Sequence, residues 1–381
     1  MPNTPQKLIP VGGQAVIEGV MMRSPHSFTV AVRRTDGRIV VRESRWISLS
    51  DRFRFLKWPV LRGSIVLLES LHNGISALTW SASIAEQGEA FKADPSREPA
   101  TVEPADPSRD QARRAQEATV DPATAKPGKA EGLPGPALWM TIGVAFLMAI
   151  GLFALLPHLL TWLIGLAFGS ENLQGGQSIW FHLVDGAVKM VILVGYMVAI
   201  SLLPDVKRLF QYHGAEHRSI HAYEARLDLT PANAQGFSTI HERCGTAFLL
   251  LVLLTAVLVF SVVFPFIPLP TESVLLNHVI FVGIKIPLLF PIGGIAYEIL
   301  RLGGKYPNHP VLRFLIGPGL LLQRITTKPP DDGQVEVAII SILKTLWRER
   351  VGGELPGDEQ DYASLDEFRA NLETSDVQQA G

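Results

Sequence analysis

Long apolar runs alternate with polar segments along the second half of the chain. They cover residues 138–160, 179–203, 246–267 and 275–300. A run of about 20 mainly apolar residues is long enough to cross a bilayer core as a helix. The pattern therefore predicts a mainly α-helical, polytopic membrane protein with four transmembrane helices that contact the lipid bilayer.

The segments that connect these runs differ in positive charge. The connections at 169–178 and 268–274 contain no Lys or Arg, whereas the connection at 204–243 and the flanks of the four runs are basic. Loops rich in Lys and Arg tend to stay on the cytoplasmic side of a membrane. We therefore expect a multi-pass protein of the cell inner (plasma) membrane with both termini and the loop 204–245 in the cytoplasm.

The region before the first apolar run has a different pattern. Phe28–Val32 and Ile39–Val41 are rich in β-forming residues, and the Asp36-Gly37 pair between them is a strong hairpin signal. Residues 53–83 are apolar at helical spacing but interrupted by charges, which is typical of an amphipathic helix on a membrane surface. Residues 1–84 are thus predicted to form an N-terminal cytoplasmic β-hairpin element followed by an interfacial helix.

A glycine-rich segment precedes the predicted hairpin. Gly12, Gly13 and Gly19 lie in a stretch without the Gly-Lys-Ser/Thr ending of a phosphate-binding loop. Glycine readily adopts turn conformations, so we expect these glycines in tight turns. The alternative is that Glu18 and Arg23 face a ligand.

The remaining polar segments complete the predicted organisation. Residues 85–136 are rich in proline and poor in large apolar side chains, which predicts a disordered linker. Residues 301–350 should form cytoplasmic amphipathic helices: Pro310–Thr327 as a surface-lying helix interrupted by a turn at Gly317-Pro318-Gly319, then Val335–Arg350. The acidic tail at 351–381 is expected to be mobile.

Composition narrows the function classes. The net charge of -2 gives no sign of a nucleic-acid partner, and with 47% hydrophobic and 18% charged residues the composition suits a membrane protein. The single cysteine excludes an intramolecular disulfide. The polar N-terminus argues against a cleavable signal peptide.

Ionisable residues interrupt two of the apolar runs. His182, Asp185 and Lys189 share one face of the second run, and His278 and Lys285 lie on the fourth. Such groups are costly in a bilayer and usually face protein or a water-filled cavity. One interpretation is a structural charge pair, since Asp185 and Lys189 are four residues apart; the other is a polar cavity for transport or substrate entry.

Metal-ligand residues gather in the basic connection between the second and third runs. His213, Glu216 and His217 follow the order H-x-x-E-H, in which two His bind zinc and the Glu handles a water proton. Residues four apart lie on one helix face, so both imidazoles can face one ion. The motif predicts bound Zn or another divalent metal, with Glu216 as catalytic base. The alternative is a charged loop of solvated side chains.

Further ligands follow in the same connection. His241 and Cys244 can fold back towards the motif. If both join His213 and His217, the zinc shell is closed and structural; if only three residues bind, a water occupies the open position and Glu216 can take its proton. We favour the catalytic arrangement, because a structural site does not need Glu216. Cys244 as a nucleophile at the start of the third run is a further alternative.

Helix geometry limits the part that Glu224 can play. It lies about 10 Å along a continuous helix from His217, at 1.5 Å per residue, which is too far for a shared ion. Glu224 can instead bind a second metal with His221, or orient a metal-binding histidine.

Three motifs together resemble the YqhQ-like family of bacterial membrane proteins. They are Val11–Pro25 (VGGQAVIEGVMMRSP), Gln211–His217 (QYHGAEH) and His241–Thr246 (HERCGT). The resemblance covers most of the chain apart from residues 85–136 and the acidic tail. It implies a polytopic inner-membrane protein described as a predicted metal-dependent enzyme. By motif position it implies metal-site residues at His213, Glu216, His217, Glu224, His241 and Cys244, whereas His221 does not belong to the family pattern.

Two hypotheses follow for the function. The first is a membrane-embedded zinc hydrolase that acts at the cytoplasmic face on an unknown substrate, such as a lipid-linked molecule or a membrane peptide. The second is a non-enzymatic scaffold or transporter with a structural metal, in which Asp185, Lys189 and Lys285 line a path. The sequence is compatible with a homo-oligomer.

Overall fold

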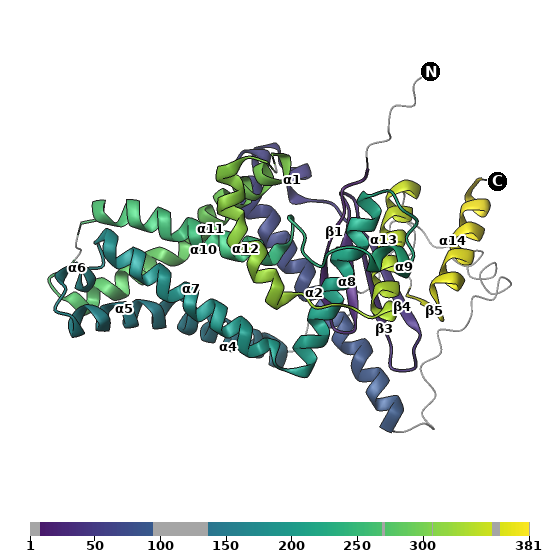
Figure 1. The fold of residues 1–381 in the computed structure, drawn as a ribbon, viewed down its shortest axis with the longest axis horizontal. Coiled ribbons are helices and arrows are strands. Elements are labelled where there is room, and N and C mark those ends of the chain that lie inside the picture. The colour runs from purple at the N-terminus through teal and green to yellow at the C-terminus, as the bar shows by residue number, and fades with distance from the viewer. Residues whose placement is uncertain (1–7, 94–135, 269–270, 307, 353–358, 381) are drawn as a thin grey trace, which may run out of the picture.

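The computed structural model describes residues 8–93, 136–268, 271–306, 308–352 and 359–380. In Figure 1 the chain forms a sheet covered by helices and a long helical bundle that projects from it. The predicted linker at 85–136 lies mostly outside the described residues, and its first residues belong to a helix.

One antiparallel sheet contains five strands in sequential order. They are β1 (Gly12–Val16), β2 (Gly19–Arg23), β3 (Ser27–Arg33), β4 (Ile39–Arg45) and β5 (Gln360–Tyr362). The predicted hairpin is confirmed as the β3–β4 pair. Its turn contains Gly37 at a φ of 91°, a conformation that glycine adopts without steric cost.

The expectation that Gly12 and Gly13 serve tight turns was wrong. Both lie in β1, and the turn before β2 is formed by Ile17 and Glu18 instead. The glycine at position 13 permits a close approach: a Cβ there would lie 2.6 Å from the Met21 carbonyl oxygen and 3.0 Å from Cδ of Glu216. Gly13 therefore serves packing rather than a turn.

The β1–β2 turn is bonded to a helix that packs on the sheet. Glu18 forms an ion pair with Arg208 of α8 (Pro204–Glu224) and accepts a hydrogen bond from the Tyr212 hydroxyl at 3.3 Å. Arg23 lies with its guanidinium 5.7 Å from the ring centroid of Trp46. Glu18 is thus held by partners within the chain, whereas Arg23 contacts the Trp46 ring and its Nη1 has no hydrogen-bond partner among the described residues.

Each face of the sheet has its own core, because successive strand residues point to opposite sides. One face, including Met22, packs against α8 and α13 (Asp332–Val351). The other face, including Met21, packs against the second half of α2 (Leu61–Ala93) through Ala77 and Trp80. The helix predicted at 335–350 is thus a buried element, and it begins at a capping box formed by Asp331 and Gln334.

Part of the tail that we expected to be mobile is structured. β5 pairs with β4, and α14 (Leu365–Ala380) follows it. Tyr362 and Phe368 are buried in the same core as α8 and α13. Two aromatic side chains therefore stabilise a segment whose acidic composition suggested disorder.

Among the described residues, four helices of the bundle are long and apolar enough to cross a membrane, as predicted. They are Gly143–Ala167, Ile179–Ser201, Gly245–Phe266 and Val274–Lys305. The first combines part of α4 (Pro136–Ile150), a π-helical turn (Gly151–Leu155) and α5 (Leu156–Ala167); the others are α7 (Ile179–Ser201), α10 (Gly245–Val263) with the 3₁₀ turn η3 (Phe264–Phe266), and α11 (Val274–Lys305). The short α6 (Glu171–Gln174) lies at the far tip.

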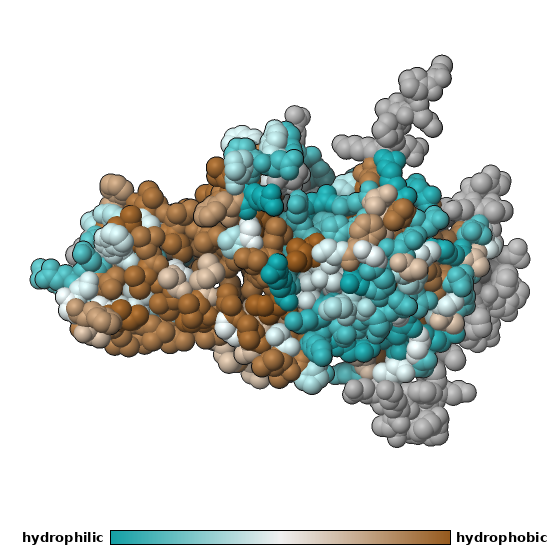
Figure 2. All heavy atoms as spheres, in the orientation of Figure 1, coloured by the Kyte–Doolittle hydropathy of each residue, from teal (hydrophilic) through white to brown (hydrophobic). Residues whose placement is uncertain are grey.

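The surface of the molecule separates into an apolar and a polar part. In Figure 2 hydrophobic residues cover the bundle, while hydrophilic residues dominate over the sheet and reappear at the bundle's far tip. A bilayer requires this kind of apolar band between polar ends. The distribution is that of a multi-pass membrane protein.

Two further helices join the bundle to the sheet. The first half of α2 packs on α11, where Arg62 pairs with Glu298 and a Cβ on Gly63 would lie 2.8 Å from the Gly294 carbonyl oxygen. α12 (Pro310–Thr326) packs on α10. The prediction of a turn within α12 was wrong, because the helix continues through Pro318. Short helices at 49–52, 54–57 and 231–235 (α1, η1 and α9) complete the described elements.

Candidate metal centre

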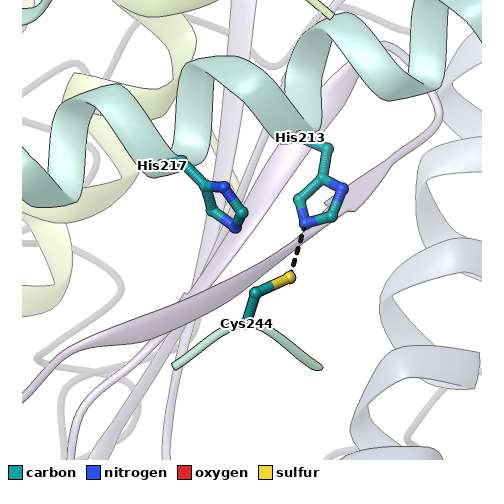
Figure 3. A group of neighbouring side chains, drawn as sticks. All are labelled: His213, His217 and Cys244. Atoms are coloured by element: carbon teal, nitrogen blue, oxygen red, sulfur yellow. Dashed lines mark hydrogen bonds between the residues drawn. The ribbon is translucent and has the colours of Figure 1, made fainter. Parts of the chain in front are cut away.

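Three of the predicted ligands converge where the bundle meets the sheet. His213 and His217 extend from one face of α8, and Cys244 faces them from the N-cap of α10 (Figure 3). One ligand atom from each lies within 4.8 Å of the others. A spacing of four residues on α8 brings the two imidazoles together. The chain then folds back so that the N-cap residue of α10, Cys244, places its thiol beside them.

Hydrogen bonds orient both imidazoles. Nδ1 of His213 lies 2.8 Å from the carbonyl oxygen of Thr326, and Nδ1 of His217 lies 2.5 Å from that of Thr239. A carbonyl oxygen only accepts, so each Nδ1 carries the proton and each Nε2 keeps a free lone pair. This is the arrangement in which protein histidines bind metals. Thr239 and Thr326 give no sequence signal, because their carbonyls rather than their side chains act here.

Gly214 lets α8 approach the segment that supplies these carbonyls. A Cβ at this position would collide with the carbonyl oxygen of Lys328, and it would lie 3.3 Å from Cγ2 of Thr239. The backbone N–H of Lys328 in turn donates to the Phe210 carbonyl at 2.8 Å. A side chain at position 214 would separate α8 from both segments that orient the imidazoles.

Cys244 is hydrogen-bonded at this point as a thiol. Its Sγ lies 3.2 Å from Nε2 of His213 and 3.1 Å from Oγ1 of Thr246. Because the proton of the His213 ring is on Nδ1, the thiol donates to Nε2. Burial raises the pKa of Cys244, while hydrogen bonds from Thr246 and Ala247 lower it. The thiol proton therefore lies between Sγ of Cys244 and Nε2 of His213, where a cation bound by both atoms would lie.

Burial also keeps His217 in the neutral form that metals require. The pKa of His217 is lowered to about 2, mainly by burial and next by neighbouring His213, while the bond to Thr239 raises it. Burial likewise lowers the pKa of His221 and of His241. A neutral imidazole has the lone pair that a metal ion binds.

Glu216 lies on the same helix turn and is 4% exposed. Burial raises its pKa to about 8, whereas His213 and a hydrogen bond from Gly13 lower it. Among the described residues its Oε2 has no hydrogen-bond partner. The close approach of Gly13 in β1 thus confines the carboxyl beside the ligand group. Sequence analysis identified Glu216 but not the role of Gly13, which lies about 200 positions away.

His221, Glu224 and His241 form a second group, with ligand atoms within 4.8 Å of one another. Nδ1 of His241 accepts from the Arg243 backbone N–H at 3.2 Å, so its proton is on Nε2, which lies 3.5 Å from Oε2 of Glu224. Glu224 is also paired with the Arg243 guanidinium. His241, Glu224 and Arg243 therefore already form hydrogen bonds or ion pairs with one another.

The predicted ligands thus divide between two neighbouring groups. His241 and Glu224 lie in the second group, and the ring centroids of His217 and His241 are 5.6 Å apart. The backbone of His241 is held by two bonds of 2.8 Å with the Gln323 side chain. His221, whose Nε2 lies 2.9 Å from the Ile240 carbonyl, joins this group although its claim from the motifs was weak.

The chain has relatives among known proteins. Residues 58–348 match the family described as protein of unknown function, DUF1385. The chain is also 34% identical over 344 residues to the uncharacterized protein YqhQ of Bacillus subtilis (strain 168), covering 89% of this chain and 92% of that protein. No solved structure matches.

Proposed function

The chain belongs to the DUF1385 family, in agreement with its resemblance to YqhQ-like proteins, and we propose that it is a metal-dependent membrane hydrolase. His213, His217 and Cys244 are the metal ligands in this proposal, and Glu216 is the catalytic base. The observation that carries it is the convergence of two Nε2 lone pairs and one thiol on a single point.

The donor set fits zinc. Two imidazole nitrogens and one sulfur suit this borderline-soft ion, and catalytic zinc sites have three protein ligands with a fourth position for water. Zinc supplies Lewis acidity and lowers the pKa of a bound water to about 7. Binding replaces the thiol proton of Cys244 and uses the lone pairs already present on the two imidazoles.

Glu216 is suited to proton transfer by its position and by its unpartnered oxygen. It lies one residue before His217 on the helix face that carries the ligands, and its Oε2 has no partner among the described residues. As a carboxylate it accepts the proton of the attacking water, and as an acid it returns a proton to the leaving group. The Gly13 backbone restrains it throughout.

We place the metal centre at the cytoplasmic face of the inner membrane. The basic residues between α7 and α10 support this orientation by the positive-inside rule, and with it both termini are cytoplasmic. In this orientation α2 and α12 lie near the interface. Cys244 caps a spanning helix, which favours a substrate that reaches the site from the bilayer, such as a lipid-linked molecule or a membrane peptide.

Elemental analysis of protein purified in detergent without chelators tests the metal. We expect about one zinc per chain, lost in the double variant His213→Ala/His217→Ala and kept in the matched control His221→Ala, since three-ligand sites fail without two of their ligands. Wild-type protein without any metal would refute the proposal.

Glu216→Gln separates catalysis from metal binding. The amide cannot accept a proton, so the variant should keep its zinc and fail to rescue a deletion strain. Full rescue would instead support the second candidate, a scaffold or transporter with a structural metal. The observation that favours that candidate is the group formed within the bundle by the buried Asp185 and Lys285 and the half-buried Lys189.

A further inference from the structure

Ionisable side chains also lie inside the bundle, away from the metal centre. They are His158 on α5, His182, Asp185 and Lys189 on α7, and His278 and Lys285 on α11. All except Lys189 are buried. Buried polar groups in an apolar bundle are costly and usually functional, so their connections matter.

Four of these side chains form an unbroken chain of hydrogen bonds. Lys285 Nζ lies 3.2 Å from Asp185 Oδ2 and 3.2 Å from Nδ1 of His158. Nε2 of His158 lies 2.8 Å from Nδ1 of His278, whose Nε2 lies 3.1 Å from the carbonyl oxygen of Gln174. Lys189 adds a bond of 2.6 Å to Asp185.

The direction of every bond is determined by its two ends. The carbonyl of Gln174 only accepts, so His278 carries its proton on Nε2 and accepts on Nδ1. His158 therefore donates from Nε2 and accepts on Nδ1, where the Lys285 ammonium donates. From Lys285 to Gln174 every donor points along the chain of bonds, whereas the bond from Lys285 to Asp185 Oδ2 points the other way. The shared direction from Lys285 to Gln174 is what sequential proton transfer needs.

The chain of bonds ends beside a pocket. His278 lines it together with residues 174–176 and Thr271, Glu272 and Asn277. This end of the bundle, made by residues 169–178 and 271–274, is called the loop end below. The pocket gives the outermost imidazole contact with solvent, while Lys285 and Asp185 stay buried between helices.

Few other charges face Lys285. On α7 it faces His182 as well as Asp185 and Lys189, and on α10 it lies against Phe260 and Phe264, each ring centroid 5.5 Å from Nζ. α2 offers Arg62, paired with Glu298, which is about 20 Å further along α11 at 1.5 Å per residue. Within the described residues, His158 and His278 form a hydrogen-bonded connection from Lys285 to the pocket.

We propose that His158 and His278 form a proton relay between the pocket at the loop end and the Lys285–Asp185 pair inside the bundle. The Lys285 ammonium gives a proton to Nδ1 of His158, and the Nε2 proton of His158 passes to Nδ1 of His278. The Nε2 proton of His278 leaves its bond to the Gln174 carbonyl and passes to water in the pocket that both residues line. One proton leaves, Lys285 becomes a neutral amine, and both imidazoles have exchanged tautomers; the reverse sequence restores the start.

The relay is independent of the metal centre. It places the charge of the Lys285–Asp185 pair in equilibrium with the pH of the compartment at the loop end. Lys189 remains beside Asp185 and keeps a positive charge on the pair when Lys285 is neutral.

Hydrogen–deuterium exchange of the imidazole N–H groups tests the relay. The full chain, labelled with ¹⁵N-histidine, is reconstituted into bilayers and transferred to D₂O, and loss of each ring N–H signal is followed by solid-state NMR. We expect the buried His158 N–H to exchange within tenfold of the rate of His278. In His278→Gln, which keeps a polar side chain but cannot relay protons, exchange at His158 should slow by at least a hundredfold.

The direction of this effect separates a relay from loosened packing. A destabilised bundle exchanges faster, whereas an interrupted relay exchanges more slowly. His182→Gln, on the neighbouring helix face, is the matched control and should leave the His158 rate unchanged. Unaltered or faster exchange in His278→Gln, or a wild-type His158 as protected as the α5 backbone amides, would overturn the proposal. If His278→Gln does not reconstitute, His158→Gln in protein labelled with ¹⁵N-lysine gives the same test on the Lys285 ammonium.

Discussion

The histidines at the proposed metal centre and those inside the bundle are hydrogen-bonded in two different ways. His213 and His217 each donate Nδ1–H to a carbonyl, so their Nε2 lone pairs face one point, where the Cys244 thiol donates to Nε2 of His213. His158 and His278 are bonded in series, and the lone pair of each ring is already occupied by its neighbour. Lone pairs that face one point can bind one metal ion, whereas rings hydrogen-bonded in series can pass a proton from one to the next. The direction of hydrogen bonds therefore separates two sites that share a residue type.

The two groups also differ in charge. The bundle holds an aspartate between two lysines, so its stability depends on ion pairs. At the metal centre, burial favours neutral His217 and a protonated Glu216 when no metal is bound. Replacing the carboxyl with an amide should therefore destabilise the bundle at Asp185 but stabilise the metal-free protein at Glu216.

Asp185→Asn should give the largest effect. It leaves Lys189 and Lys285 without a counter-charge between apolar helices, and breaking a buried pair in this way costs about 3–5 kcal/mol. Asp36→Asn is the matched control, because Asp36 pairs with Arg34 on the surface and such pairs contribute about 0–1 kcal/mol. Thermal unfolding of both variants in one detergent measures the difference. Equal losses would contradict the ionic description of the bundle.

Glu216→Gln should stabilise the metal-free protein near neutral pH. The folded-state pKa of about 8 lies above the ordinary value of 4.5, so the stability from the protonated form is complete below pH 4.5 and is lost as pH rises through 8. At pH 7 this loss is about 3 kcal/mol by linkage, and the amide removes it. Unfolding of wild type and variant in a chelator, at pH 4.5 and pH 7.5, checks the sign. A difference that does not grow with pH would show that Glu216 is ionised without metal.

Local patterns were enough to predict that three side chains of the candidate site lie together on one helix. His213, Glu216 and His217 lie on one helix, where a spacing of four residues sets their direction. The four apolar helices could also be predicted, since length and composition define them. The Asp36-Gly37 hairpin follows the same logic of short-range geometry.

Other features depend on packing between distant segments. The contact of Gly13 with Glu216 exists because β1 packs on α8, and the carbonyls of Thr239 and Thr326 have no side-chain signature. The Gly-Pro-Gly signal predicted a turn in α12, but the helix continues and Gly319 packs closely on Ala247 of α10. Tertiary contacts thus outweighed a local breaker. Similarly, a three-residue strand such as β5 is too short to leave a periodic pattern.

Gly214→Ala should have a smaller effect on stability, but one specific to the metal centre. The new methyl group collides with the Lys328 carbonyl, and overpacking of this kind costs about 1–3 kcal/mol. Relief of the collision moves the 326–328 segment and with it the Thr326 carbonyl that orients His213, so metal affinity should fall about 10- to 100-fold. Gly245→Ala is the matched control, since nothing lies within 4 Å of its added Cβ. Zinc titration beside thermal unfolding separates the two effects: a variant that loses stability but keeps its affinity would show that the Thr326 carbonyl does not set the direction of the imidazole.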